Sequence, residues 1–224
     1  MKNLFKVLIA VAAITGVASV YAVPTLTMTA STGGSVTVTD GGGGDACPAP
    51  GCVTFIGAVG VWKLNVDTGL TKPALRPPPQ MDLSYLASTG GTSTPTHLAS
   101  TMTIDWSDSG FNGNFFATDL LGGTQTAGMT TTDHIFINGV LVFTLGPFTA
   151  TAFSSSTSGF ITLHPTDVLT LEMVISKPTS TGSSTFTATG NKNFTAVPDG
   201  GSAVALLGIA LVGVETLRRK LKAA

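Results

Sequence analysis

Charged side chains are scarce in this sequence, and neither sign dominates. Lys and Arg number 11, Asp and Glu number 12, and together they make up 10% of the 224 residues. Neutralising nucleic-acid phosphates requires a basic excess, so the composition argues against a nucleic-acid partner. Long helices and coiled coils draw heavily on Ala, Glu, Lys, Leu and Arg, so an extended helical protein is also disfavoured.

Histidine is equally scarce, and recognisable catalytic motifs are lacking. The three His residues (His97, His134 and His164) lie far apart, and neither a His-Glu-x-x-His nor a Gly-x-Ser-x-Gly motif occurs. We therefore expect no enzymatic activity. A hydrolytic triad is the alternative, because two Asp–His pairs lie close in the sequence: Asp133 with His134, and His164 with Asp167.

Small hydroxyl side chains are abundant instead, with 36 Thr and 18 Ser. They alternate with apolar residues: Leu26, Met28 and Ala30 fall on one face of an extended segment, and the intervening Thr residues fall on the other. No window shows the period of an amphipathic helix. Strands are expected in residues 25–32, 35–39, 53–66, 98–106, 114–121, 148–153, 160–163, 168–176 and 184–188.

The strongest local signal is Asn138-Gly139 between two runs of β-branched and aromatic residues. Both residues of a type I′ turn need a positive φ, so this pair predicts a β-hairpin. About ten short strands separated by turn residues predict an all-β fold, an antiparallel β-sandwich that is jelly-roll-like. Residues 41–44, 77–79 and 154–158 are expected to be loops, and 73–97 an extended excursion.

The N-terminus carries the pattern of a secretory signal peptide. Lys2 and Lys6 precede a largely apolar run over residues 7–20, and Val20 and Ala22 are small residues at the −3 and −1 positions of a cleavage site. The run is shorter than the ~20 residues needed to span a bilayer, which favours a cleaved signal helix over residues 1–22 rather than an uncleaved anchor.

The C-terminus carries a second membrane-directed pattern. Val197, Pro198, Asp199, Gly200 and Gly201 precede an apolar segment over residues 203–214, and a basic cluster follows it. The cluster, expected to act as a membrane stop on the cytoplasmic side, contains Arg218, Arg219 and Lys220. A helix of this length rises about 18 Å, less than the ~30 Å hydrocarbon core, so this transmembrane-type helix suits transient anchoring.

This tail resembles the VPDSG-CTERM variant of the PEP-CTERM sorting signals of Gram-negative bacteria. Residues 197–201 stand where that variant has Val-Pro-Asp-Ser-Gly, with Gly200 in place of Ser. The resemblance implies an exosortase-like membrane enzyme as processing partner. It also implies export, transient anchoring in the inner membrane, and a final place at the cell surface or outside the cell, often with exopolysaccharide. An ordinary C-terminal membrane helix is the alternative.

Three parts of the chain are therefore expected: a signal peptide (1–22), one β-sandwich domain (23–196) and a sorting signal (197–224). The middle part has ten acidic and five basic residues, a net charge of −5. Residues 50–120 are similar to an uncharacterised β-rich domain common in PEP-CTERM-tailed proteins, which brings no catalytic residues with it.

Cys47 and Cys52 are the only cysteines. An exported chain with two thiols in an oxidising compartment favours a structural disulfide between them, and free thiols are the alternative. The spacing is not Cys-x-x-Cys, which argues against a redox role. The closed loop is small, so the bridge is expected to stiffen this loop rather than stabilise the whole fold.

Oxygen-bearing side chains gather over residues 105–119. Asp108, Asn112 and Asp119 fall at positions 1, 5 and 12 of a calcium-loop template, and Asp105 lies just before it. However, Gly110 occupies the third position, Asp replaces the terminal Glu, and the flanking helices are missing. Asp and Asn also form turns by bonding their own backbone. We expect turns without a cofactor, and keep calcium as the alternative.

Large aromatic side chains raise the question of sugar binding. Trp62, Tyr85, Trp106, Phe111, Phe115 and Phe116 are expected in the core rather than on a sugar-stacking platform.

The expected function is that of a non-enzymatic surface or extracellular-matrix protein; a carbohydrate-binding module, with or without calcium, and a glycan hydrolase are the alternatives. A binding module needs exposed coplanar aromatics on one sheet. A hydrolase needs paired carboxylates, so finding Asp105 and Glu172 together in a pocket with a raised pKa would contradict the purely structural interpretation.

Overall fold

The computed structural model describes residues 23–72, 75, 80–89, 98–179 and 184–197, with side chains left out at 66–68. The expected signal helix (1–22), the sorting residues from Pro198 onward, and the apolar helix with Arg218, Arg219 and Lys220 lie outside the described residues. Within the described ranges, no helix has the length and apolarity needed to cross a membrane.

The described residues form twelve strands: β1 (Thr25–Ala30), β2 (Ser35–Thr39), β3 (Cys52–Val59), β4 (Trp62–Leu70), β5 (Gln80–Thr89), β6 (Ser100–Ser109), β7 (Gly113–Gln125), β8 (Thr130–Ile137), β9 (Val140–Phe148), β10 (Ala152–Leu163), β11 (Val168–Lys177) and β12 (Ser184–Ala196). They pair antiparallel throughout.

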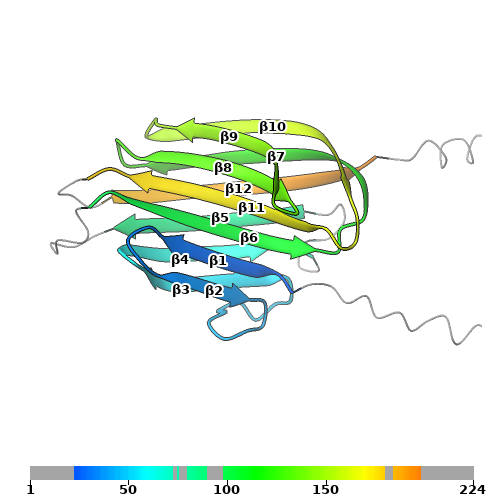
Figure 1. The fold of residues 1–224 in the computed structure, drawn as a ribbon, viewed down its shortest axis with the longest axis horizontal. Helices are drawn as coiled ribbons and strands as arrows, with labels where there is room; N and C mark the ends of the chain where they lie inside the picture. The colour runs from blue at the N-terminus through cyan, green and yellow to red at the C-terminus, as the bar shows by residue number, and fades with distance from the viewer. Residues whose placement is uncertain (1–22, 73–74, 76–79, 90–97, 180–183, 198–224) are drawn as a thin grey trace, which may run out of the picture.

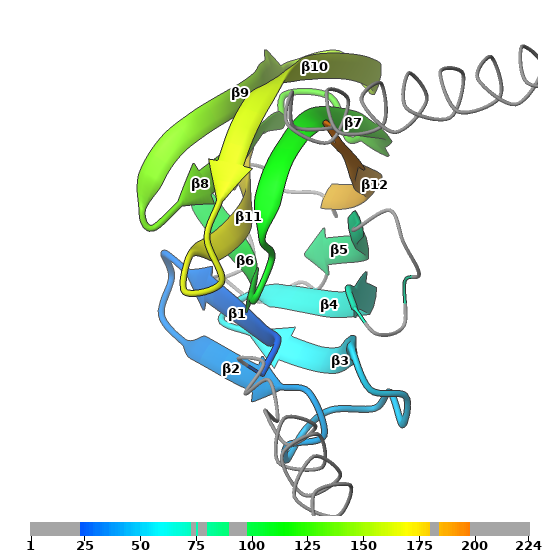
Figure 2. The same cartoon turned by 90° about the vertical axis from the view of Figure 1, so that its right-hand side faces the viewer.

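Two six-stranded sheets face each other (Figure 1 and Figure 2). Sheet A has the order β2-β1-β6-β11-β8-β9, and sheet B has the order β10-β7-β12-β5-β4-β3. The edge strands β9 and β10 lie together on one side of the molecule, and β2 and β3 lie together on the other (Figure 2). The expected all-β antiparallel sandwich is confirmed. Between β5 and β12 the chain passes repeatedly from one sheet to the other, which agrees with a jelly-roll-like topology.

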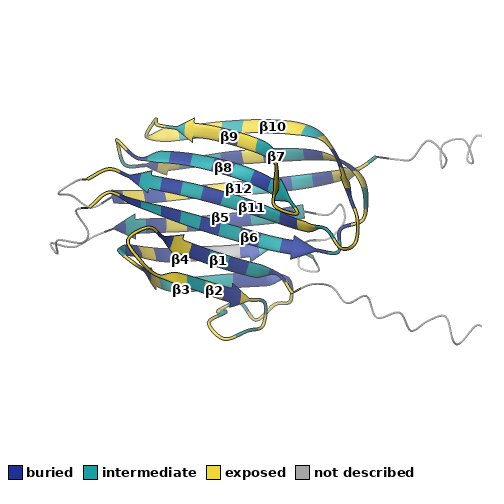
Figure 3. Cartoon of the chain, viewed as in Figure 1, coloured by how far each residue is buried: buried dark blue, intermediate teal, exposed yellow. Residues whose placement is uncertain are grey.

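Alternation of buried and more exposed residues along most strands builds the core between the sheets (Figure 3). In β11 every second residue is buried, and in β12 buried and more exposed residues alternate in the same way. The buried set includes Trp62 from sheet B and Trp106 from sheet A. Trp62 donates its indole N–H to Ser100 Oγ at 2.9 Å, so a hydrogen bond also crosses between the sheets.

Four expectations about the strands were wrong. Residues 149–151, within the expected strand 148–153, form the turn between β9 and β10. Residues 80–89, within the expected excursion, form β5, an interior strand of sheet B between β12 and β4. Residues 154–158, expected to be a loop, lie in the edge strand β10, where small hydroxyl side chains face solvent. The expected strand 53–66 is a hairpin, because Gly60 has a φ of 58° and turns the chain between β3 and β4.

Candidate functional site

A row of polar side chains crosses the outer face of sheet A. Six residues are register partners from one edge to the other: Thr37, Thr27, Asp105, Glu172, His134 and Thr144. Because side chains of directly paired residues lie on one face of a sheet with Cβ atoms about 5 Å apart, the row places two carboxylates and an imidazole next to one another.

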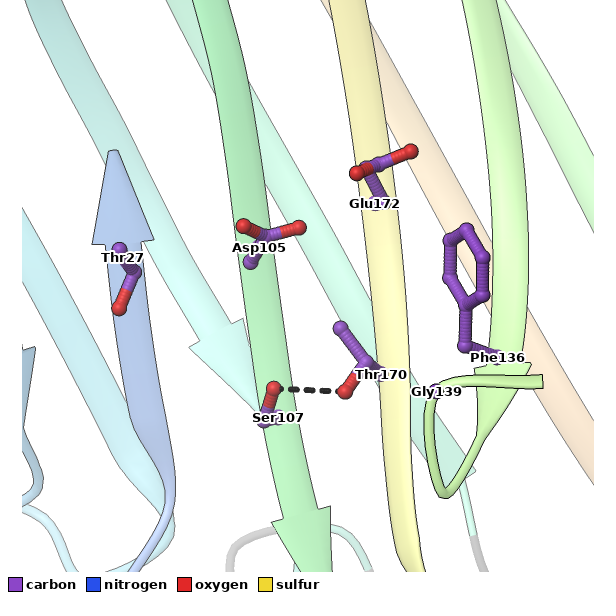
Figure 4. Close-up of a pocket in the computed structure, with 7 residues that line it drawn as sticks. All are labelled: Thr27, Asp105, Ser107, Phe136, Gly139, Thr170 and Glu172. Atoms are coloured by element: carbon purple, nitrogen blue, oxygen red, sulfur yellow. Dashed lines mark hydrogen bonds between the residues drawn. The ribbon is translucent and has the colours of Figure 1, made fainter. Parts of the chain in front are cut away.

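A shallow pocket of about 410 Å³ lies on this row (Figure 4). Its lining comes from sheet A and the turn after β8: Thr27, Asp105, Ser107, Phe136, Gly139, Thr170 and Glu172. Figure 4 shows Asp105 and Glu172 on neighbouring strands, with the Phe136 ring on the far side of Glu172. Ser107 and Thr170 close one end through a hydroxyl hydrogen bond of 2.8 Å.

The two carboxyl groups differ in their partners. A hydrogen bond of 2.8 Å joins His134 Nδ1 to Glu172 Oε1. Partial burial, and then the negative charge of Glu172, raise the pKa of Asp105 from 3.8 to about 6. Near that pH the Asp105 carboxyl group can carry a proton.

This pair meets the condition that we set against a purely structural protein. Asp105 and Glu172 share a pocket, and one of them has a raised pKa. Retaining glycoside hydrolysis uses a protonated acid and a carboxylate whose carboxyl groups lie about 5 Å apart. The pocket, however, is shallow and is lined from one side of the sandwich only, so water reaches both groups. The geometry therefore supports a polar binding surface. Whether the pair also hydrolyses glycans is a question for an activity assay.

The expected calcium ligands do not share one site. Asp105 faces outward from β6, whereas Asp108 is buried and accepts hydrogen bonds from Thr71 Oγ1 and Lys72 Nζ, both at 2.7 Å. Asp119 is buried between the sheets against Lys192. Asn112 is exposed in the turn between β6 and β7. Among the described residues, no group of three or more His, Cys, Asp or Glu side chains is arranged to hold a metal ion.

Most of the aromatic side chains lie in the core, as expected. Trp62, Tyr85, Trp106, Phe111 and Phe115 are at most 4% exposed. Phe116 differs: it is 37% exposed and packs against the exposed Phe160 across β7 and β10. Their ring planes are tilted by 68°, so they are not the coplanar platform that a sugar-stacking site needs.

The histidines form no catalytic triad among the described residues. His97 lies outside the described residues. His164 is in an exposed turn, where its Nδ1 lies 3.2 Å from Asp167. Asp133 and His134 are consecutive in β8, so their side chains point to opposite faces of sheet A.

A disulfide joins Cys47 and Cys52, with Cα atoms 5.8 Å apart. The carboxylate of Asp45 organises the same loop by accepting backbone hydrogen bonds from Gly41, Cys47 and Thr54 at 2.9–3.0 Å. The loop connects β2 of sheet A to β3 of sheet B.

The core contains a charged cluster that was not predicted from the sequence. Lys192 on β12 is 1% exposed and forms ion pairs with Asp119 on β7 and with Asp133 on β8. The available signal was alternation: Asp119, Asp133 and Lys192 all occupy inward positions of their strands, where an apolar residue is expected.

The tail is the part of the chain that comparison with known families identifies. Residues 196–221 match the VPDSG-CTERM motif, which confirms the resemblance inferred from residues 197–201. No curated protein matches the chain.

Several solved structures give low-scoring structural matches. The structure of TmCBM61 in complex with β-1,4-galactotriose has 8% identity and a TM-score of 0.31, over 59% of this chain and 88% of that chain. A family 35 carbohydrate binding module from an environmental isolate has 14% identity and a TM-score of 0.25, over 43% and 72%. The infectious bursal disease virus Gx strain structure has 14% identity and a TM-score of 0.32, over 81% and 53%. Scores this low carry no inference about the ligand or activity of this chain.

Proposed function

We propose that this protein is exported, held briefly in the inner membrane, and processed at its tail by an exosortase-like enzyme. Its mature form is a non-enzymatic component of the cell surface or extracellular matrix, associated with exopolysaccharide. Because Asp105 and Glu172 share a pocket, we do not propose that its role is purely structural. The observation that carries the proposal is the match of residues 196–221 to the VPDSG-CTERM motif. The position of the tail supports it: β12 ends at Ala196, so a cut within 197–201 leaves all twelve described strands on one fragment.

The outer face of sheet A suits a hydrated polysaccharide matrix. Its hydroxyl side chains pair across strands, as in Thr27 with Thr37 at 3.2 Å and Thr101 with Ser176 at 3.0 Å. Each hydroxyl both donates and accepts hydrogen bonds, so these uncharged pairs can exchange partners with water or sugar hydroxyls.

Mass spectrometry of the protein from its native host tests the sorting step. We expect loss of residues 1–22 and of the basic tail from the wild type. A variant with Pro198→Ala and Asp199→Ala in the motif keeps the tail, and Thr195→Ser in β12, just outside the motif, serves as the matched control. A wild-type protein that retains its tail would show that the segment is a plain membrane anchor.

The pocket beside Asp105 and Glu172 favours a second candidate function, glycan binding. Two carboxyl groups can accept hydrogen bonds from sugar hydroxyls, and the Phe136 ring at the same pocket offers an apolar surface for a sugar face. We propose no cofactor for this site.

Calorimetric titration with the host's exopolysaccharide tests the second candidate. Binding to the wild type should weaken at least tenfold in Asp105→Asn and in Phe136→Ala, and should be unchanged in Thr162→Ser on sheet B. Equal binding by all three variants would place the glycan elsewhere. Repeating the titration with a calcium chelator tests calcium dependence, and release of reducing sugar that disappears in Asp105→Asn would establish a hydrolase instead.

A further inference from the structure

The buried cluster between the sheets brings one amine against two carboxyl groups. Lys192 Nζ contacts Asp119 Oδ1, and it lies 2.5 Å from Asp133 Oδ2. The three residues are at most 2% exposed. Lys192 and Asp119 are register partners on β12 and β7 of sheet B, and Asp133 reaches them from β8 of sheet A.

As an ionic cluster, this arrangement is incompletely satisfied. Two carboxyl groups share one ammonium group, Asp119 Oδ2 has no hydrogen-bond partner, and neither has the hydroxyl of the buried Tyr85. Removing ions from water costs several kcal/mol each, and the mutual attraction offsets this only when the remaining polar atoms are also bonded. Joining the amine to a carboxyl group would remove both charges of that pair.

We propose that Lys192 Nζ and the Asp119 side chain form an intramolecular isopeptide bond inside the sandwich, with Asp133 transferring the protons. The modification is spontaneous and follows folding, because only the folded chain brings these three strands together. It depends on neither the sorting step nor the glycan-binding pocket.

The reaction balances without any added reagent. Asp133 takes a proton from the Lys192 ammonium group, and the freed lone pair attacks Cγ of Asp119, forming the C–N bond. Nζ gives up a second proton, and the two protons, relayed through Asp133, leave with one Asp119 oxygen as water when its C–O bond breaks. An ammonium and a carboxylate become an amide and one water molecule, and Asp133 returns to its initial state.

The surroundings of Asp133 suit a proton-transfer role. Burial and the nearby charge of Asp119 raise the pKa of Asp133 to about 7, and the charge of Lys192 opposes this rise. A group that titrates near neutral pH both accepts and returns a proton readily. Gly190 lies two residues before Lys192 on the same face of β12, and a Cβ there would come within 3.3 Å of Nζ. The glycine therefore leaves space for the amine.

Asp119 is the acceptor because of its place in the sheet. It lies directly opposite Lys192 on the neighbouring strand, so a bond between the two side chains needs no movement of one sheet against the other. The pair of Lys72 with Asp108 provides a contrast. Asp108 also accepts hydrogen bonds from the Thr71 hydroxyl and the Ser109 N–H, and the Lys72 side chain is 23% exposed.

Mass spectrometry of the full-length chain, reduced and denatured, tests the bond. We expect the wild type to be lighter than its sequence by one water molecule, and trypsin not to cut after Lys192, because an acylated amine is not a tryptic site. Fragmentation of the digest should recover a branched peptide joining the Asp119 and Lys192 segments.

Three variants should have the full mass: Lys192→Arg, Asp119→Ala and Asp133→Asn. Lys72→Arg is the matched control and should keep the loss of water. Circular dichroism of Asp133→Asn, which changes the shape of the side chain least, shows whether a lost bond merely reflects lost folding. A folded wild type with full mass and normal cleavage after Lys192 overturns the proposal, and a branch at Asp133 overturns the choice of acceptor.

Discussion

At the residue scale, the face of the sheet to which a side chain points determines its chemical surroundings more than its position along the chain does. Asp105 and Asp119 lie fourteen positions apart among the candidate calcium ligands of the sequence. The structure places Asp105 on the outer face of sheet A and Asp119 inside the sandwich on sheet B. The first sits beside another carboxylate, and the second sits beside an amine, so the two differ in chemistry.

The raised pKa of Asp105 gives a pH-dependent prediction. Between pH 3.8 and about 6 the folded protein binds more protons at this group than the unfolded chain does. The free energy of unfolding therefore falls as the pH rises through this window. We expect Asp105→Asn to raise the free energy of unfolding at pH 7.5 by about 1 kcal/mol, a value that allows for solvent screening of this partly exposed group. At pH 3.5 the substitution should change it little. Urea denaturation at both pH values measures this.

Asp167 provides a control of opposite sign. Hydrogen bonds from the His164 backbone and the Asn138 side chain lower the pKa of Asp167, so its stabilisation is present at neutral pH and is lost in acid. Asp167→Asn should lower stability at pH 7.5 and have little effect at low pH. Equal effects of both substitutions at every pH would contradict the assignment of charge as the cause.

Gly69 is predicted to be essential for packing around Trp106. A Cβ at this position would lie 2.7–2.8 Å from the Trp106 ring, which is fully buried and cannot move aside cheaply. We expect Gly69→Ala to lower the free energy of unfolding by about 1–3 kcal/mol through overpacking. Gly43→Ala, where no atom lies within 4 Å, should change it little. Similar denaturation midpoints for both variants would contradict this close contact.

Residue-level prediction from the sequence succeeded where burial follows from chemistry alone. The burial of Trp62 and Trp106 followed from their size and apolarity. The row through Asp105, Glu172 and His134 could not be predicted, because it depends on the register of three strands that are distant in the sequence.

At the scale of single elements, the hairpin between β8 and β9 shows what local sequence can specify. Asn138 and Gly139 have φ angles of 51° and 76°, as the type I′ turn requires. Asn138 also accepts a hydrogen bond from Val168 N–H at 2.9 Å and donates one to Asp167 at 2.8 Å, so this turn is tied to the start of β11.

Substitutions at Asn138 should separate these two contributions. Asn138→Ala loses both hydrogen bonds and strains the positive φ, at a cost of about 2 kcal/mol. Asn138→Gly keeps the backbone conformation and should cost about 1 kcal/mol, from the lost hydrogen bonds alone. Thermal unfolding of the two variants gives the difference, and a glycine variant as unstable as the alanine variant would show that backbone strain contributes nothing.

Elements that depend on distant partners were harder to predict. The strand over residues 35–39 was predicted with its observed bounds, because its alternation is complete. The Ser tract of β10 reads as a loop by composition, yet pairing with β7 along its whole length makes it a strand. β5 was hidden in a region rich in Pro and Gly, and its interior position comes from pairing with β12 and β4.

At the scale of the whole molecule, we predict that residues 23–196 unfold as one unit. The buried side chains of both sheets form a single apolar cluster. Trp62 reports on sheet B and Trp106 on sheet A, so Trp106→Phe and Trp62→Phe each leave one fluorescent probe. In each variant, the remaining fluorescence and the far-ultraviolet circular dichroism should follow the same denaturation curve. Curves that separate would divide the sandwich into two domains.

The position of β12 has a consequence for the order of events during export. β12 is the final described strand, and it lies inside sheet B with β5 and β7 as its neighbours. A chain that crosses a membrane from its N-terminus delivers this segment last, so sheet B stays split into two parts until translocation has almost ended. In the sorting pathway proposed above, closure of the sandwich then coincides with arrival of the tail at the bilayer, so completion of the domain and its proposed detachment compete in time.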